Sequence, residues 1–414
     1  MVGPRPYPRL AEARLTEALA DTPVVLVHGP RQCGKTTLAR MVGDRTGRSY
    51  FTFDDEAVLA AAKADPTGFV DDLPTQVILD EVQRVPHLFA SLKRAVDRDR
   101  RPGRFLLTGS SNVLLLPRLS DSLAGRMEMV RLHPLAQAEL ARGPSDFIER
   151  LFEGRHPTRA VARLGHDLAP LLAGGGFPAA LARPTARRRA TWYRDYVETL
   201  VQRDVRELAR IASLDAIPRL LALVGAQTAR LLNVSELSAP LGLSRPTVRD
   251  YLTLLERIFL VDELPPWHGN RLSRLVKTPK VHLGDSGLAC SLLGLDAAAL
   301  AADRAALGQL LETFVVQELR RIASGLPDRI DFLHYRDRDG AEVDVVLERG
   351  PRELAGVEVK AGATVTASDF RGLRKLQEAA GPSFKAGVVL YDGEATLPFG
   401  ERLRAVPLRM LWEA

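Results

Sequence analysis

The chain has 414 residues, of which 46% are hydrophobic and 26% are charged, and a formal net charge of +6. This composition excludes a disordered chain and allows two or three domains. Two cysteines, Cys33 and Cys290, exclude a disulfide framework, and the histidines lack the spacing of a zinc site. No apolar run approaches the ~20 residues of a membrane span, and the N-terminus lacks a signal-peptide core, so we expect a cytoplasmic protein without membrane contact. The positive charge fits nucleic-acid binding, but a solvated arginine-rich surface explains it equally well.

The first part of the chain alternates short apolar runs with helical patterns. The apolar runs cover residues 24–28, 49–54, 76–81, 104–110 and 127–132. Because such alternation is typical of βαβ units, it predicts an α/β fold with a parallel sheet and helices on both of its faces.

The first apolar run leads into a glycine-rich loop and then into a helical pattern. Residues 29–36 have the spacing Gly-x-x-x-x-Gly-Lys-Thr of a phosphate-binding loop, in the strand, loop and helix context that such a loop requires. Its backbone N–H groups would cradle a triphosphate, Lys35 would reach the β- and γ-phosphates, and the Thr36 hydroxyl would ligate Mg²⁺. We therefore predict ATP and Mg²⁺ as cofactors. The predicted nucleotide-binding residues are Gly29, Pro30, Arg31, Gln32, Cys33, Gly34, Lys35, Thr36 and Thr37.

Two acidic residues, Asp80 and Glu81, end the third apolar run. In phosphoryl-transfer enzymes with this loop, one carboxylate at this place holds Mg²⁺ and another orients the attacking water. We therefore predict Asp80 as a metal ligand, together with Thr36, and Glu81 as a catalytic residue. The alternative is that the two acids only cap the following helix.

Polar residues lie after the fourth apolar run and before the fifth. Asn112, or Ser110 beside it, could sense the γ-phosphate from the edge of the sheet, and we predict Asn112 as catalytic. Arg126 could act as a catalytic arginine finger on the nucleotide of a neighbouring subunit. The alternative is an ordinary surface arginine.

The chain becomes mainly helical from about residue 135 to residue 230. Residues 174–178, Gly-Gly-Gly-Phe-Pro, break this pattern, and residues 187–211 then predict one amphipathic helix. We expect its apolar and aromatic stripe to be core rather than a base-stacking platform. The stripe consists of Trp192, Tyr193, Tyr196, Val197, Leu200, Val201, Val205 and Leu208.

Residues 233–252 predict a helix, a tight turn and a second helix. Gly242 suits the turn, and Ser244 suits the N-cap of the second helix. Residues 259–264 are typical of the first wing strand of a winged helix. If this unit binds DNA, Arg245, Thr247 and Arg249 begin its recognition helix. The alternative is a protein-protein module or an ATPase lid.

The last part of the chain is α/β again and carries an acidic and basic constellation. Strands are expected over 280–283, 342–347 and 356–360, and a helix over 307–323. Glu312, Asp344, Glu358 and Lys360 have the pattern of a metal-dependent nuclease, in which three carboxylates hold metal and the lysine, here predicted as catalytic, positions water. Glu342 is either a further ligand or a charge at the strand edge. The alternative is an inert folding or binding vestige, in which Asp344 and Lys360 form a salt bridge.

The motifs together resemble a prokaryotic family of AAA-type ATPases whose members are commonly named only "ATP-binding protein". The resembling segments are residues 29–38, 79–83, 107–111, 123–126, 175–178 and 203–205. One departure is small, since Cys33 stands at a variable position of the loop. The resemblance implies an AAA-type ATPase with an uncharacterised C-terminal domain similar to the restriction-endonuclease-like, PD-(D/E)xK fold.

We expect four regions and a function built on the ATPase. The regions are an AAA-type P-loop domain (1–134), a helical lid or linker (135–215), a winged-helix-like domain (216–270) and an endonuclease-like α/β domain (271–414). The predicted function is Mg²⁺-dependent ATP hydrolysis coupled to an action on nucleic acid, in a homo-oligomer bridged by Arg126. The alternative is a nucleotide-gated switch or scaffold for protein partners with an inert C-terminal domain.

Overall fold

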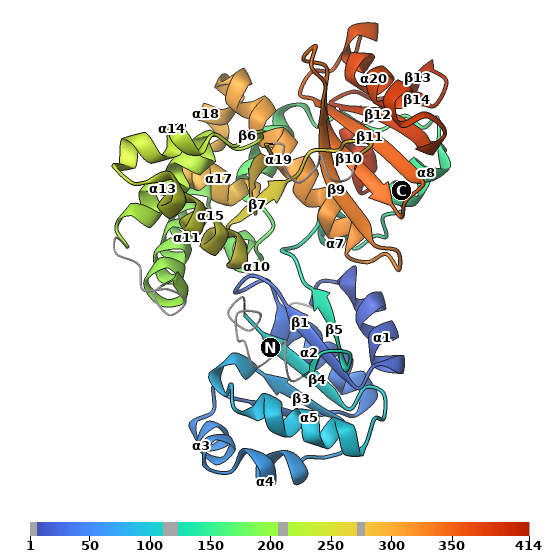
Figure 1. Ribbon diagram of the computed structural model, residues 1–414. Helices are drawn as coiled ribbons and strands as arrows, with labels where there is room; N and C mark the ends of the chain where they lie inside the picture. Colours follow the sequence, from blue (N-terminus) through green and yellow to red (C-terminus); the bar gives the residue numbers. More distant parts are fainter. Residues whose placement is uncertain (1–5, 111–122, 206–213, 271–277, 414) are drawn as a thin grey trace.

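The computed structural model describes residues 6–110, 123–205, 214–270 and 278–413 (Figure 1). The described residues form three sheets, one in the N-terminal third, a small one in the middle and one near the C-terminus.

The N-terminal sheet has five parallel strands in the order β2-β3-β4-β1-β5. They are β1 (Val24–His28), β2 (Ser49–Thr52), β3 (Val77–Asp80), β4 (Phe105–Gly109) and β5 (Met127–Arg131). The helices between them are α1 (Ala11–Asp21), α2 (Lys35–Thr46), α3 (Glu56–Ala64), α4 (Pro66–Asp71), the short 3₁₀ turn η1 (Val82–Arg84) and α5 (Leu88–Arg98). The predicted α/β sheet is confirmed, with all five strands in the expected places.

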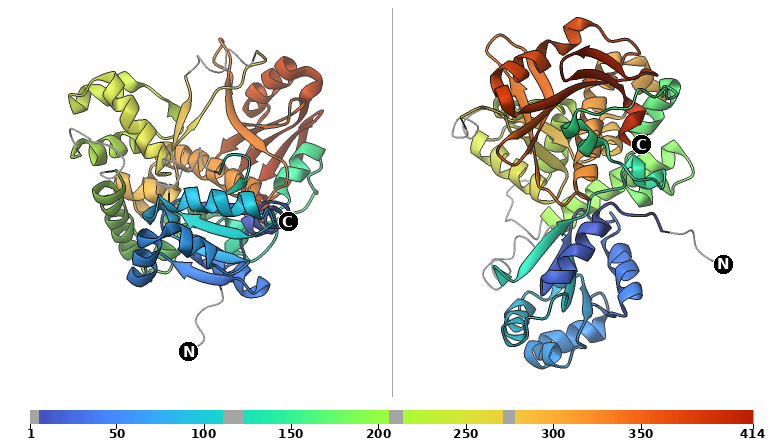
Figure 2. Two further views of the ribbon diagram at one scale, coloured as in Figure 1. Left: turned by 60° about the horizontal axis from the view of Figure 1, so that its bottom comes forward. Right: turned by 90° about the vertical axis from the view of Figure 1, so that its right-hand side faces the viewer.

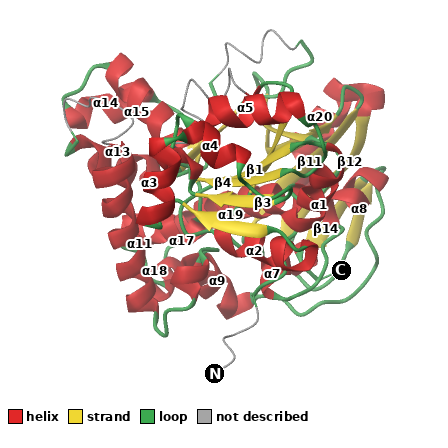
Figure 3. Ribbon diagram, turned by 90° about the horizontal axis from the view of Figure 1, so that it is seen from below, coloured by secondary structure: helices red, strands yellow, loops and turns green. Residues whose placement is uncertain are grey.

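Helices cover both faces of this sheet, which explains why its strands are apolar throughout (Figure 3). Val25 and Val27 of β1 pack in the core beneath α1 and α2. Val24 and Leu26 point to the other face and pack in the core beneath α4 and α5. Parallel strands direct their carboxyl ends to one edge, so the loop after β1 and the acids after β3 meet there.

The middle of the chain is helical around a three-stranded antiparallel sheet with the order β6-β8-β7. The strands are β6 (Arg230–Leu231), β7 (Val261–Leu264) and β8 (Lys280–Leu283). The helices are α7 (Gln137–Leu140), α8 (Phe147–Glu153), η3 (Gly165–Asp167), α9 (Leu168–Gly174), α10 (Pro178–Leu181), α11 (Ala186–Leu200), α13 (Ala216–Ala226), α14 (Val234–Ser238), η5 (Ala239–Leu241), α15 (Arg245–Arg257), α17 (Ser286–Leu293) and α18 (Ala297–Ala302).

The helix expected over 187–211 is shorter as an α-helix. Helix α11 ends at Leu200 and continues as a π-helical turn, η4 (Val201–Val205), and residues 206–211 lie outside the described ranges. The expected apolar stripe is buried as far as it is described. Its aromatic rings pack around Phe177, with Trp192 and Tyr196 stacked at 4.9 Å between centroids. The stripe is therefore core, as predicted.

The C-terminal sheet is mixed and has the order β13-β14-β12-β11-β10-β9. Its strands are β9 (Ile330–Arg336), β10 (Glu342–Arg349), β11 (Glu353–Lys360), β12 (Phe384–Tyr391), β13 (Leu397–Gly400) and β14 (Leu403–Pro407). Its helices are α19 (Arg304–Ala323), η6 (Ala367–Phe370), α20 (Arg371–Ala380), η7 (Gly381–Ser383) and η8 (Leu408–Leu411). The expected hairpin β10–β11 and the helix that carries Glu312 are both present.

The packing runs across two of the expected domain boundaries. Strand β8 follows residue 270 but pairs with β7 and β6, which precede it. Helix α8, expected in the lid region, packs on β11 and β12 of the C-terminal sheet. One apolar core therefore extends from Ala138 to Trp412, whereas the N-terminal sheet has cores of its own and lies to one side (Figure 2). None of the helices in the described part of the chain is long and apolar enough to cross a membrane.

Candidate functional site

The loop between β1 and α2 has the backbone of a phosphate cradle. Gly29 and Gly34 adopt φ values of +154° and +102°, which suit glycine, and a Cβ at Gly29 would lie 2.1 Å from the Leu132 carbonyl oxygen. Gln32 also has a positive φ, of +59°. The loop therefore turns tightly around a space at the N-terminus of α2, where backbone N–H groups favour anions.

Lys35 lies at the base of this space and is 6% exposed. Its ammonium group donates to the carbonyl oxygens of Gly29 and Pro30, at 3.0 and 2.8 Å. Among the described residues no carboxylate forms an ion pair with it. A buried cation held only by carbonyl groups is well placed to exchange them for phosphate oxygens.

Thr36 and Asp80 lie side by side below the cradle. The Thr36 hydroxyl donates to both carboxylate oxygens of Asp80, at 3.0 and 3.1 Å. The Tyr50 hydroxyl donates to the same carboxylate at 2.7 Å, and the Thr108 hydroxyl donates to it as well. Burial and the neighbouring Asp80 raise the pKa of Tyr50, so Tyr50 stays a donor. A hydroxyl and a carboxylate are ligands that Mg²⁺ prefers, so this pair fits the expected metal.

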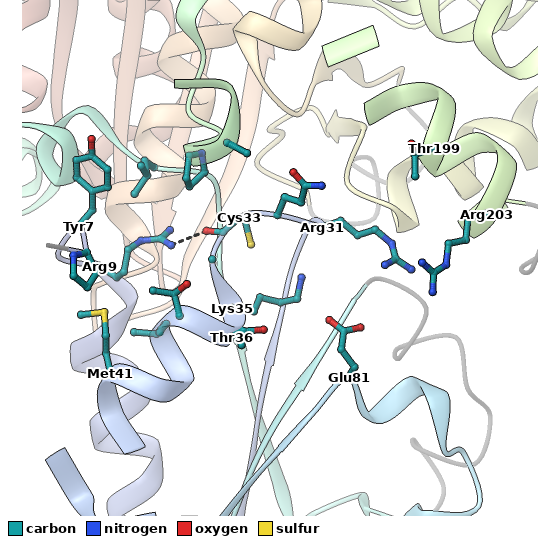
Figure 4. Close-up of a pocket in the computed structure, with 18 residues that line it drawn as sticks. Tyr7, Arg9, Arg31, Cys33, Lys35, Thr36, Met41, Glu81, Thr199 and Arg203 are labelled. Carbon is teal, nitrogen blue, oxygen red and sulfur yellow. Dashed lines mark hydrogen bonds between the residues drawn. The ribbon is translucent and has the colours of Figure 1, made fainter. Parts of the chain in front are cut away.

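Glu81 follows Asp80 with a left-handed backbone, at φ +59° and ψ +43°. This conformation is uncommon outside glycine and costs of the order of 1–3 kcal/mol. It turns the carboxylate toward the cavity beside the loop (Figure 4). The Gln83 side chain donates to this carboxylate. Glu81 therefore has the location expected of a residue that orients water, and it does not cap η1 through its side chain.

The cavity has a volume of about 590 Å³ and lies between the loop and the middle of the chain. Seven of the nine predicted nucleotide-binding residues line it, from Arg31 to Thr37. Thr199 and Arg203, from the end of α11 and from η4, close the other side. Figure 4 shows the guanidinium groups of Arg31 and Arg203 pointing toward one another near Glu81. Two neighbouring cations at the mouth of a phosphate cradle favour an anionic ligand.

Two contacts outside the sequence prediction hold the loop in place. The Arg9 guanidinium, which precedes α1, donates to the Cys33 carbonyl oxygen at 2.8 Å and to the His133 carbonyl oxygen at 2.6 Å. The Tyr196 hydroxyl of α11 donates to the Arg31 carbonyl oxygen at 3.2 Å. Arg203 belongs to the Arg-Asp-Val triplet noted in the sequence, but no local pattern predicted that it faces the loop.

The other residues predicted for the ATPase lie in different places. Asn112 lies outside the described residues. Ser110 follows β4 directly and has a buried hydroxyl without a hydrogen-bond partner among the described residues. Arg126 pairs with Asp97 at 2.7 Å beside the start of β1, at the edge of the sheet opposite the loop. In its own chain Arg126 therefore cannot reach the nucleotide.

The predicted helix, turn and helix are present as α14, η5 and α15. Gly242 turns the chain at φ +63°, and the Ser244 hydroxyl accepts from the Thr247 N–H at 3.2 Å as an N-cap. Arg245 is exposed in the first turn of α15. Arg249 is exposed too, but it pairs with Glu263 of β7 at 2.6 Å. On the candidate DNA-contacting face, Arg245 is therefore more available to a ligand than Arg249.

The structure brings together the four C-terminal residues predicted from the nuclease pattern. Lys360 donates to Glu358 at 3.0 Å, and one oxygen of Asp344 accepts the Val359 N–H at 3.0 Å. Glu312 of α19 and Asp344 contact the same ammonium group, that of Lys280. Burial, and then the Asp344 charge, raise the pKa of Glu358 to about 8.

A residue that the sequence did not single out lies between these carboxylates. The Lys280 ammonium, 2% exposed, contacts Glu342 at 2.5 Å, Glu312 at 2.8 Å and Asp344 at 3.2 Å. Its carboxylate neighbours raise its pKa against the effect of burial. In the described ranges no group of three or more acidic, histidine or cysteine side chains has a geometry that could hold a metal ion. The predicted metal ligands Glu312 and Asp344 thus pair with a lysine.

Comparison with known proteins identifies the N-terminal region but not the others. Residues 21–141 match a family model described as an AAA domain. Residues 165–299 and 307–411 match two models, each described as a domain of unknown function, and the first of these spans both boundaries expected at 215 and 270. Uncharacterised proteins of Mycobacterium tuberculosis and Mycobacterium bovis are each 32% identical over 404 residues, covering 96% of this chain and 83% of their own.

Two solved structures show a distant resemblance to the chain. A Walker-type ATPase of Pyrococcus abyssi aligns with 17% identity and a TM-score of 0.44, over 69% of this chain and 96% of that one. A RuvB mutant of Thermotoga maritima aligns with 18% identity and a TM-score of 0.29, over 62% and 89%. At these scores the AAA assignment follows from the family model and the loop, not from the neighbours.

Proposed function

The chain belongs to the family of the two uncharacterised mycobacterial proteins and carries an AAA domain, and we propose that it is a Mg²⁺-dependent ATPase that acts on nucleic acid. The observation that carries the ATPase part is the cavity in which Lys35, Thr36 and Glu81 meet. Its volume of about 590 Å³ lies within the ~300–1,000 Å³ of ordinary ligand sites.

Each residue of the site has a role in the proposed reaction. Lys35 leaves its two carbonyl partners and binds the β- and γ-phosphates, while the N–H groups of residues 29–37 hold the triphosphate. Thr36 and Asp80 would hold Mg²⁺, which neutralises charge on phosphate oxygens when it is bound. Glu81 orients a water molecule and accepts its proton as the water oxygen bonds to the γ-phosphorus. The bond to the bridging oxygen breaks, and ADP and phosphate leave.

The ATPase part is tested by replacing Lys35. We expect Lys35→Ala to abolish detectable hydrolysis and to weaken ATP binding at least tenfold, because the buried ammonium group at the base of the cradle is lost. Lys63→Ala, an exposed lysine on α3, is the matched control and should behave like the unchanged protein. If Lys35→Ala retains ATP binding and hydrolysis, the proposal fails.

The nucleic-acid part is supported by the N-terminus of α15. Exposed Arg245 and partly buried Thr247 follow the tight turn at Gly242, which is the arrangement in which a recognition helix meets a major groove. We expect duplex DNA to raise the ATPase rate and Arg245→Ala to reduce this stimulation. Arg257→Ala, at the other end of the same helix, should not. If neither DNA nor RNA stimulates the ATPase, the nucleic-acid part of the proposal fails, and the ATPase part is unaffected.

The ion pair between Arg249 and Glu263 favours a second candidate. A recognition-helix arginine that is already paired is less available to phosphate, as expected of a nucleotide-gated switch or scaffold for protein partners. In that case ATP alone should change the accessibility of α15 to protease, with no effect of nucleic acid.

A homo-oligomer is part of the proposal because Arg126 lies far from the loop of its own chain. As an arginine finger it would complete the site of a neighbouring subunit. Mixing Arg126→Ala with Glu81→Gln protein should then restore activity in sites that combine an intact Glu81 with an intact Arg126. If mixing restores no activity and the protein is a monomer both with and without ATP, the homo-oligomer part of the proposal is wrong.

A further inference from the structure

Lys280 reaches the carboxylate cluster from a different part of the fold. It begins β8 of the small sheet, whereas Glu312 lies on α19 and Glu342 and Asp344 lie on β10 of the C-terminal sheet. The β9–β10 register shifts between Val343 and Val346, so Asp344 lies in a bulge. Such a bulge re-aims a side chain. Here Asp344 accepts from Lys280 with one oxygen and from the Val359 N–H with the other.

We propose that the Lys280 ammonium takes the place of a divalent cation in this cluster, so that the C-terminal region does not bind metal there. Three carboxylates surround the ammonium within 2.5–3.2 Å, and an ammonium has three N–H donors for them. A metal bound by the same oxygens would need ligand distances of about 2.0–2.6 Å from one point, which the ammonium already fills.

The small sheet fixes the backbone position of Lys280. Its backbone is paired on both sides, with Leu264 of β7 and with Leu231 of β6. The next three residues of β8 are buried as well. Moving the buried ammonium away would separate it from the three carboxylates that compensate its charge, which opposes the entry of a metal ion.

Two carboxylates of the cluster also lie beside other basic side chains. Lys360 compensates Glu358 at 3.0 Å, and the half-exposed Arg336 lies 3.8 Å from Glu342. The constellation that the sequence assigns to a metal-dependent nuclease is therefore a network of ion pairs that joins the small sheet to the C-terminal sheet. This inference concerns the C-terminal cluster and stands whether or not the ATPase proposal holds.

Binding of Mn²⁺ tests the proposal. It is measured through the electron paramagnetic resonance signal of the free ion. The full chain is used without nucleotide, and every protein carries Asp80→Asn to remove the metal ligand near the loop. At about 1 mM free Mn²⁺, where even weak dedicated sites for hard cations fill, we expect the Asp80→Asn parent to bind no stoichiometric ion.

Adding Lys280→Ala to the parent should create a site for one Mn²⁺ per chain, and adding Asp344→Asn as well should remove it. Lys385→Ala, a lysine on β12 that contacts Glu353, is the matched control and should create none. One equivalent of Mn²⁺ bound to the parent overturns the proposal, as does a folded Lys280→Ala protein that binds none. If Lys280→Ala does not fold, Lys280→Met serves in its place, and the parent measurement decides by itself.

Discussion

Two residues at or beside the candidate site have an unusual backbone conformation or an unusual environment. Glu81 has a left-handed backbone that a glycine would adopt more easily, and His28, just before the loop, is buried beside two cations. Such features are costly and are kept where function or packing requires them. Each leads to a measurable expectation.

Replacing Glu81 by glutamine should separate binding from hydrolysis. The amide keeps the size of the side chain but cannot accept a proton, so we expect kcat to fall by about 10²- to 10⁴-fold. ATP affinity should change little, because Lys35 and the loop remain. Phosphate release in a single turnover and binding of a fluorescent nucleotide measure the two effects. Glu56→Gln on α3 is the control, and a Glu81→Gln protein with full activity would show that another residue is the base.

His28 should make the fold less stable as the pH falls. Burial, then the charges of Arg131 and Lys35, lower the pKa of His28 to about 3. Between about pH 3 and the ordinary pKa of about 6.5, His28 binds a proton in the unfolded chain but not in the folded chain. The free energy of unfolding therefore falls by up to about 1.4 kcal/mol for each pH unit by which the pH is lowered. We expect the Tm of His28→Gln to fall less than that of the unchanged protein between about pH 7 and pH 5. The exposed His166→Gln is the control, and parallel curves would contradict the prediction.

At the scale of elements, one buried carboxylate joins α17, α11, α19 and the glycine break before α10. Asp285 caps α17 through the Leu288 N–H at 3.1 Å and accepts from the Tyr193 hydroxyl at 2.9 Å. It also accepts from the Gly176 N–H at 2.8 Å and pairs with Arg321 at 2.9 Å.

The glycine break is required by the same contacts. A Cβ at Gly175, where φ is +65°, would lie 2.2 Å from an oxygen of Asp285 and 2.1 Å from the Tyr193 hydroxyl. The Gly-Gly-Phe-Pro motif is thus a packing requirement around Asp285.

Removing the Asp285 carboxylate should destabilise the fold strongly for a single substitution. Asp285→Ala leaves buried Arg321 with one fewer partner and removes the acceptor of the Leu288 and Gly176 N–H groups, so we expect a loss of about 3–5 kcal/mol in the free energy of unfolding. Asp303→Ala is the matched control, since Asp303 caps α19 at the surface, and a loss of about 1 kcal/mol is expected there. Urea unfolding measures both. Equal losses would show that Asp285 is only a cap.

At the scale of the whole molecule, the middle of the chain completes the nucleotide cavity of the N-terminal sheet. Thr199 and Arg203 line it from one side, and Arg131, at the end of β5, contacts Asp262 of β7 at 3.3 Å. Asp262 in turn pairs with Arg320 of α19 at 2.7 Å, and these arginines hold the pKa of Asp262 well below its usual range. The cavity and the rest of the chain are therefore in direct contact.

Arg203 should contribute to affinity for ATP more than for ADP, because it lies near Glu81 at the end of the cavity where the γ-phosphate is expected. We expect Arg203→Ala to weaken ATP binding by about tenfold or more, since a hydrogen bond to a charged group contributes about 1.5–3 kcal/mol. Arg187→Ala, exposed in the first turn of α11, is the control. Isothermal titration with both nucleotides measures the ratio, and equal losses would place Arg203 outside the γ-phosphate contact.

The sequence alone determined the features that depend on neighbouring residues. The strand, loop and helix around Lys35, the acids after β3, the N-cap at Ser244 and the β10–β11 hairpin follow from spacing and local propensity. They form in the structure where they were expected. Hydrophobic periodicity and capping act over a few residues, so a single chain is enough to recognise them.

Only the tertiary structure decided which distant residues complete each site. Arg203 lies across the cavity from Lys35, and Lys280 enters a cluster whose Asp344 is 64 residues away. Nothing near Lys280 in the sequence distinguishes it from a lysine at the start of an exposed strand. Its place follows from β8 pairing between β6 and β7 and from that sheet packing on the C-terminal sheet. The loop that binds phosphate is thus encoded locally, whereas the cation that fills the carboxylate cluster is supplied by long-range packing.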